Sequence, residues 1–163
     1  MRIASKHPRI DASAFREMIS GLPDAEGYEV SLRPLRYRTS PHLAAETDYE
    51  QRTIVIRLPE PFYPFGDTVA YGAKRIAAKG LRFIWLSEGV TFRTPRDVVR
   101  FLYCHEWMHW FLHERLGRKG SAETICDRFA LRNYLKRTVT TDDATAALRR
   151  RAEGTAIDRA ATR

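Results

Sequence analysis

The chain has 163 residues, of which 44% are hydrophobic and 29% are charged, and it carries a net charge of +8. This length fits one domain with a real core, and no stretch approaches the ~18 consecutive apolar residues of a membrane span. The basic N-terminus lacks the apolar segment of a secretory signal, so we expect a cytoplasmic protein. Its two cysteines, Cys104 and Cys126, should stay reduced and pack as small apolar side chains.

The first half of the chain predicts one helix and two strands, followed by a short helix and a hairpin. Phe15, Met18 and Leu22 recur at helical spacing, and alternation or β-branched residues mark the strands. Pro34 restricts the first strand to a sheet edge or a strand end. In chain order we expect a helix over 11–22, a strand over 28–32, a polar connection over 40–48, a strand over 53–58, an aromatic loop over 62–66, a helix over 68–79 closed by Gly80, and a hairpin of strands 81–86 and 90–93 around a turn at 87–89.

The second half predicts two helices. Thr94 can cap the first, Pro95 suits the first helical position, and Asp97 favours the positive end of the helix. We expect this helix to run to about Leu116 and to end at Gly117. The second helix is expected to have Ser121 as its N-cap and to carry along one side Glu123, Cys126, Asp127, Ala130 and Tyr134.

Residues 105–109 read His-Glu-Trp-Met-His, which is the HExxH pattern of zinc peptidases. Residues four apart lie on one face of a helix, so His105 and His109 can bind the same Zn²⁺ ion. Glu106 is then placed to take a proton from water at the metal. The pattern therefore predicts one zinc site per chain, with Glu106 as the general base.

A catalytic zinc usually takes three protein ligands, so the two histidines need a third. We expect Glu123 in this role, because a tight turn over 117–120 would fold the second helix back against the first. Asp127 lies one turn further on the same face and could accept a hydrogen bond from a liganding histidine. The alternative is that Glu123 is only a favourable acid in the first turn of a helix.

His113 competes with Glu123 for the third position. Successive turns of a straight helix rise by about 5.4 Å, so three imidazoles on one stripe do not easily surround one ion. We therefore expect His113 to support a liganding residue, to donate to the substrate or to lie at the surface. His113, Tyr103 and Tyr134 are the candidates for binding the oxyanion, and the sequence does not order them. An extended substrate could pair with either strand 53–58 or strand 81–86.

Residues 105–113 and 123–131 resemble the ImmA/IrrE-type gluzincin metallopeptidases, which carry HExGHxxLH followed by ExxANxFAxxLL. Met108 departs from the glycine that this family often has before the second histidine. The resemblance implies cleavage of a specific protein substrate, because the family is associated with cleaving DNA-binding transcriptional repressors. By position it implies the zinc ligands His105, His109 and Glu123, the catalytic base Glu106, and Asp127 beside the ligands.

These features predict an α+β protein. We expect a small single-domain, zincin-like fold, in which a mixed sheet packs against the HExxH helix and a following helix that bears the glutamate. This domain should cover residues 1–138. Residues 139–163 are expected to form a basic tail that is disordered or weakly helical.

Two other functions fit parts of the sequence. Its arginines are scattered apart from one run at Arg149–Arg151, which favours solubility or loose attraction to polyanions, with nucleic-acid binding as the alternative. A DNA-associated protease of the SprT-like kind would use this charge, although that pattern normally has a later histidine and none follows His113. The chain could also be a zinc-bound interaction protein without hydrolysis, against which the intact Glu106 argues. No membrane partner is expected, and the oligomeric state stays open.

Overall fold

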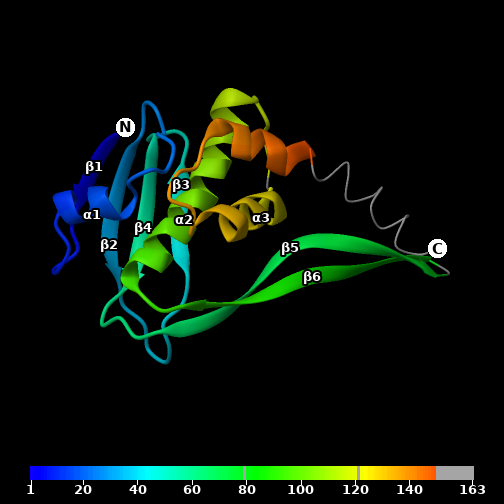
Figure 1. Ribbon diagram of the computed structural model, residues 1–163, viewed down its shortest axis with the longest axis horizontal. Helices are drawn as coiled ribbons and strands as arrows, with labels where there is room; N and C mark the ends of the chain where they lie inside the picture. The colour runs from blue at the N-terminus through cyan, green and yellow to red at the C-terminus, as the bar shows by residue number, and fades with distance from the viewer. Residues whose placement is uncertain (79, 121, 150–163) are drawn as a thin grey trace.

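The computed structural model describes residues 1–78, 80–120 and 122–149. Figure 1 shows a sheet with helices packed against one of its faces, and a long two-stranded arm that leaves this body. The architecture is α+β with a mixed sheet in a single small domain, which confirms the predicted fold class. No helix in the described part of the chain is both long enough and apolar enough to cross a membrane.

The sheet has four strands in the order β1-β2-β4-β3. Strands β1, β2 and β4 are parallel, and β3 runs antiparallel to β4 at one edge. Pro34 lies near the end of β2, beyond the last residue that pairs with β1, so an interior strand tolerates it. The strand bounds are β1 Arg2–Ser5, β2 Glu29–Leu35, β3 Ala44–Asp48 and β4 Thr53–Pro59.

Strand β3 occupies part of the segment that we expected to be a polar connection, so that prediction was wrong. Alanine and acidic residues are poor strand formers, and nothing local marks Ala44–Asp48 as extended. The segment becomes a strand because it pairs with β4 in a continuous register, from Ala44 opposite Arg57 to Asp48 opposite Thr53. The turn between them has Arg52 at a φ of 53° and a hydrogen bond from the Gln51 amide to Asp48 Oδ1 of 2.9 Å.

Helix α2, Pro95–Trp110, begins as predicted. Thr94 Oγ1 accepts a hydrogen bond from the Asp97 amide at 3.2 Å, and Asp97 Oδ2 accepts one from the Thr94 amide at 2.9 Å, which together form a capping box. The helix continues into a π-helical turn, η1, at Phe111–Arg115. The turn is followed by Gly117, which has a φ of 60° and donates its amide to the His113 carbonyl. The predicted end of the helix is therefore confirmed.

Helix α2 packs against β3 and β4 of the sheet. Helix α1, Ala12–Met18, lies within the predicted segment 11–22, and α3, Glu123–Asn133, packs along α2. The structure places the N-cap of α3 at Ala122, whereas Ser121 lies outside the described residues. Fully buried members of the core include Phe15, Leu32, Ile54, Ile56, Phe92, Phe101, Trp107 and Phe129.

The packed region extends past residue 138. Residues 141–149 are helical, and Val139, Ala144 and Ala147 belong to the core. These residues are part of the segment that we expected to be a tail, and its remaining residues, 150–163, lie outside the described residues.

The arm consists of β5, Phe65–Ala78, and β6, Gly80–Phe92, paired antiparallel along their lengths. The helix predicted over 68–79 is therefore wrong, because residues 68–78 lie in β5, whereas residue 79 lies outside the described residues; the turn predicted at 87–89 is also wrong, because it lies within β6. Alanine and lysine favoured the helix. The segment is instead a strand because its backbone groups pair with β6, whose aliphatic and aromatic residues strongly favour extended structure.

Candidate metal centre

Helix α2 presents its two motif histidines toward the same point. The Nε2 atoms of His105 and His109 are 3.1 Å apart, and both side chains are 13% exposed. Between them in sequence, Glu106 is buried. As the sequence predicted, the helical spacing puts both imidazoles on one face of α2.

Glu123 enters the same space from the first turn of α3. Its two carboxylate oxygens lie 3.2 Å from His105 Nε2 and 3.2 Å from His109 Nε2. This approach depends on the chain reversal after η1, where Gly117 and Gly120 both take positive φ angles. Helix α3 then runs back along α2 and brings its first residue to the two histidines.

The three side chains could hold a metal ion, because their donor atoms all lie within 4.8 Å of one another. Donors bound to zinc at 2.0–2.1 Å in a tetrahedron are separated by about 3.3 Å. The separations of 3.1–3.2 Å between donor atoms of His105, His109 and Glu123 are close to this value. The nitrogen and carboxylate donors are also those that zinc takes in peptidase sites. The residues therefore fit the ion.

Asp127 contacts the ring nitrogen of His105 that does not face Glu123. Its Oδ1 lies 2.7 Å from His105 Nδ1, so the ring is oriented with Nε2 toward Glu123. Burial by itself lowers the pKa of His105, but hydrogen bonds with Asp127 and Glu123 outweigh it and raise the pKa to about 9. The pKa of His109 is lowered by burial and by the charge on His105. Asp127 therefore stabilises a fixed orientation of the first histidine.

Glu106 points from α2 toward the edge strand β3. The hydroxyl of Thr47 donates a hydrogen bond of 2.7 Å to Glu106 Oε2. Burial raises the pKa of Glu106, although His105 and Thr47 oppose the shift. A carboxyl group whose pKa is raised is better suited to accept and return a proton near neutral pH.

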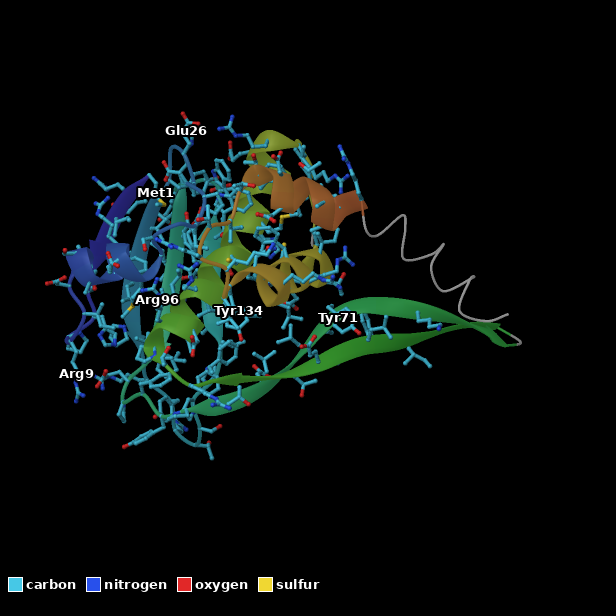
Figure 2. All side chains as sticks on the ribbon, viewed as in Figure 1. Met1, Arg9, Glu26, Tyr71, Arg96 and Tyr134 are labelled. Carbon is cyan, nitrogen blue, oxygen red and sulfur yellow. The ribbon has the colours of Figure 1, made fainter. Side chains whose placement is uncertain are left out.

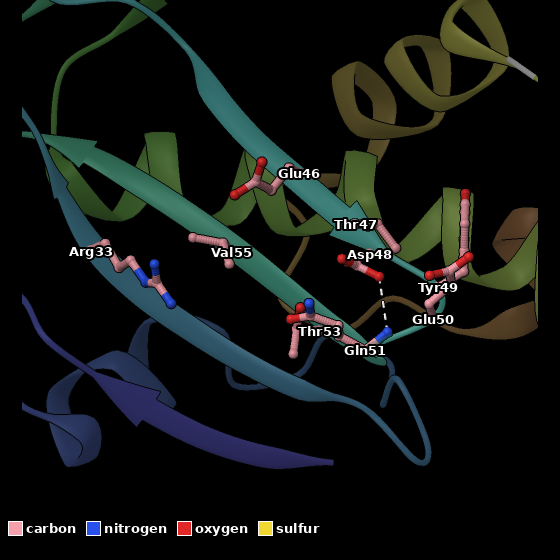
Figure 3. A pocket seen from close by; sticks show the side chains of 9 residues that line it. All are labelled: Arg33, Glu46, Thr47, Asp48, Tyr49, Glu50, Gln51, Thr53 and Val55. Carbon is pink, nitrogen blue, oxygen red and sulfur yellow. Dashed lines mark hydrogen bonds between the residues drawn. The ribbon is translucent and has the colours of Figure 1, made fainter.

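Strand β3 has two different faces at this position. Side chains alternate along a strand, so Thr47 faces α2 while its neighbours Glu46 and Asp48 face away. Figure 3 shows that open side of the sheet, with Arg33 on β2 across from the acidic residues and α2 behind. The metal centre lies on the inner face of β3, and Glu46 also lines the cleft.

His113 lies at the wall of the cleft and is not one of the three converging residues. Its ring stacks on Tyr49 at a centroid distance of 4.0 Å, and its Nδ1 lies 3.1 Å from Glu114 Oε1. The hydroxyl of Tyr28 donates to the same oxygen at 2.8 Å, so the Glu114 carboxylate is itself fixed. The π-helical turn η1 carries His113 into this position.

The two tyrosines that we considered as oxyanion donors lie elsewhere, so that prediction was wrong. The hydroxyl of Tyr103 donates to the Pro23 carbonyl at 2.7 Å on a fully buried face of α2. The ring of Tyr134 packs against Phe92 and Phe101, near the base of the arm (Figure 2). Neither lines the cleft, whereas His113 does.

Sequence reasoning missed Thr47 and Tyr49, which both line the cleft. Both were assigned to a loop or its border because β3 was not recognised. Ala44–Asp48 reads Ala-Ala-Glu-Thr-Asp, which does not alternate between apolar and polar residues, so the segment itself carried no strand signal. The cysteines, in contrast, are free and buried as predicted, and burial raises the pKa of both thiols.

Comparison of the chain with models of known protein families, with curated proteins and with solved structures finds no match. The interpretation of this centre therefore rests on its own residues and their geometry.

Proposed function

We propose that the chain is a zinc-dependent endopeptidase of the ImmA/IrrE-like gluzincin type, acting on a specific protein in the cytoplasm. The observation that carries this proposal is the convergence of His105, His109 and Glu123 beside the buried carboxylate of Glu106. Asp127 adds support, because an acid behind a liganding histidine is the usual companion of such a site.

One zinc ion per chain would be held by the three converging residues. Bound there, zinc would polarise the scissile carbonyl and make a water molecule acidic enough to lose its proton near neutral pH. Glu106 would accept that proton and later deliver it to the leaving amine. The hydrogen bond from Thr47 keeps the carboxylate of Glu106 oriented toward the cleft through both transfers.

The edge strand β3 is the best place for an extended substrate. Strand β4, one of the two strands expected to pair with a peptide, has neighbours on both sides, and residues 81–86 lie in the arm, whose described residues do not line this cleft. Strand β3 has one unpaired edge and contributes Ala45, Glu46 and Thr47 to the cleft. A peptide that pairs with this edge through its backbone would lie beside Glu106.

The test compares the wild-type chain with Glu106→Gln, using a proteome-derived peptide library and mass spectrometry to detect new termini. Glu50→Gln is the matched control, because it removes an exposed carboxylate that does not line this cleft. We expect Glu106→Gln to keep its zinc but to lose at least ~100-fold in kcat, which is the usual contribution of a general base.

Two outcomes would overturn the proposal. Cleavage that persists at the wild-type rate in Glu106→Gln would exclude this carboxylate as the base. Zinc binding without cleavage of any peptide by the wild type, together with a partner that binds both variants equally, would identify a zinc-bound interaction protein instead.

A further inference from the structure

Tyr49 lines the cleft of the metal centre, yet the mechanism described above gives it no role. It lies just beyond the end of β3, on the turn that leads to β4 (Figure 3). Tyr49 is 36% exposed. Among the described residues that line the cleft, it is the one tyrosine. A phenol at this place therefore needs an explanation.

The ring of Tyr49 is held by a series of contacts that starts in the core. Tyr28 is 2% exposed, and its hydroxyl donates to Glu114 Oε1 at 2.8 Å. The same carboxylate oxygen lies 3.1 Å from His113 Nδ1. The ring of His113 in turn stacks on that of Tyr49, with an angle of 16° between the two planes. These contacts fix the direction of the Tyr49 ring, as is required of a group that must be in place before a reaction begins.

The hydroxyl of Tyr49, unlike its ring, makes no hydrogen bond within the described part of the chain. The hydroxyls of Tyr28 and Tyr103 each have an acceptor in the protein. Burial raises the pKa of Tyr49, and nearby acidic groups, which include Glu106 and Glu123, raise it further. The hydroxyl therefore keeps its proton at neutral pH and can donate it in a hydrogen bond to a ligand in the cleft.

His113 is the other oxyanion candidate in the cleft, but its hydrogen bond indicates a different role. The hydrogen bond from Tyr28 lowers the pKa of Glu114, so the Glu114 carboxylate is ionised and only accepts hydrogen bonds. His113 Nδ1 is then the donor to Glu114, and Nε2 of the neutral ring has no proton to donate. His113 is thus a positioning residue for Tyr49.

We propose that Tyr49 binds the oxyanion that forms during peptide hydrolysis. When water adds to the scissile carbonyl, the carbonyl oxygen becomes negatively charged, and the Tyr49 hydroxyl would donate a hydrogen bond to it. A donor that is already in place stabilises this charge more than it stabilises the neutral carbonyl, which lowers the barrier. Tyr49 keeps its proton, and Glu106 performs both proton transfers. This inference rests on the proposed function, because the oxyanion forms only if the cleft hydrolyses a peptide.

The first test compares the wild type with Tyr49→Phe on the library peptide that the wild type cleaves fastest. The substitution keeps the ring that stacks on His113 and removes only the hydroxyl. We expect kcat to fall by at least ~100-fold with KM hardly changed, because an oxyanion donor acts only in the transition state. Tyr63→Phe is the matched control, since Tyr63 is 61% exposed and does not line the cleft. Metal content and circular dichroism verify that both variants are folded.

A second test needs no peptide substrate. The chain is loaded with Co²⁺ in place of zinc, and inorganic phosphate, a tetrahedral oxyanion, is titrated while the visible spectrum of the metal is followed. Tyr49→Phe should bind phosphate roughly tenfold more weakly than the wild type, because it lacks a hydrogen bond to a charged group. Azide, which has no oxygen to accept that hydrogen bond, should bind both proteins equally.

The two tests separate failure of this inference from failure of the proposed function. An unchanged kcat in Tyr49→Phe would overturn the inference and leave the peptidase intact. If the wild type cleaves no peptide, the peptidase proposal fails, and phosphate decides the role of Tyr49: equal affinities overturn it, whereas weaker binding by the variant supports it.

The positioning role of His113 is tested with the double variant Tyr49→Phe/His113→Ala. His113→Ala alone should lower kcat, but it should have no further effect once the Tyr49 hydroxyl is absent. A further fall in kcat in the double variant would assign the oxyanion contact to His113 instead.

Discussion

Arg100 and His105 lie five residues apart on α2, and both are largely buried, yet their polar atoms face different partners. The Arg100 guanidinium donates to four backbone carbonyls, those of Met18, Ser20, Tyr134 and Lys136, at 2.6–3.1 Å. It thereby joins the ends of α1 and α3 to α2. His105 and its neighbours instead point their donor atoms at one another.

The two clusters therefore differ in role: the contacts of Arg100 stabilise the fold, whereas His105 and its neighbours form the candidate metal site. A buried cation that donates to four fixed carbonyls is a structural group, and its removal should lower stability. Side chains whose donor atoms converge on one point are suited to bind an ion, and their removal should lower affinity for that ion. The same helix therefore supports two clusters whose mutants should differ in what they lose.

The largest effect that sharpens this comparison is expected for Glu123→Ala. Removing one of three ligands should weaken zinc binding on the order of a thousandfold, if the ligands share a typical zinc affinity about equally. Stability without metal should hardly change, because the Glu123 side chain is 60% exposed. Competition with a chromogenic chelator measures the affinity, with Glu17→Ala on α1 as the control. Unchanged zinc affinity would move the third ligand elsewhere.

The next effect concerns Arg100→Met, which keeps the volume of the side chain but leaves four carbonyls without their donor. We expect unfolding free energy to fall by roughly 3 kcal/mol, because several buried acceptors become unsatisfied at once. Urea denaturation measures this, and Arg96→Met, at an exposed position one turn earlier, is the control. Zinc affinity of the folded Arg100→Met protein should match the wild type. If Arg100→Met lowered zinc affinity and left stability unchanged, the distinction between the two clusters would be wrong.

The smallest of these effects is expected for Asp127→Asn. The amide keeps the shape of the side chain but loses the charge that orients His105 through the contact of 2.7 Å. Zinc affinity should fall 10- to 100-fold, which is typical when the partner of a liganding histidine is removed. The measurement is again chelator competition, with Asp142→Asn at an exposed position as the control. An affinity equal to that of the wild type would reduce Asp127 to a packing role.

The features that the sequence predicts well are those that depend on neighbours along the chain. The capping box at Thr94 and Asp97, the end at Gly117 and the position of Glu123 and Asp127 on one face of α3 all follow from spacing within one or two turns. Strand β3 and the arm do not, because each is extended through pairing with the next strand of the chain and not through the preferences of its own residues. Thr47 was missed for that reason, since its role exists only once β3 lies beside α2.

The number of residues in the π-helical turn η1 decides which side chains can bind the metal. In an uninterrupted α-helix His113 would follow His109 on the same stripe, and the motif would offer three histidines. The wider turn at Phe111–Arg115 changes the helical phase, and His113 stacks on Tyr49 instead. Glu123 approaches His109 from α3 instead of His113. A one-residue deletion within this turn would restore the α-helical phase, and with it the competition between an imidazole and a carboxylate for the same position.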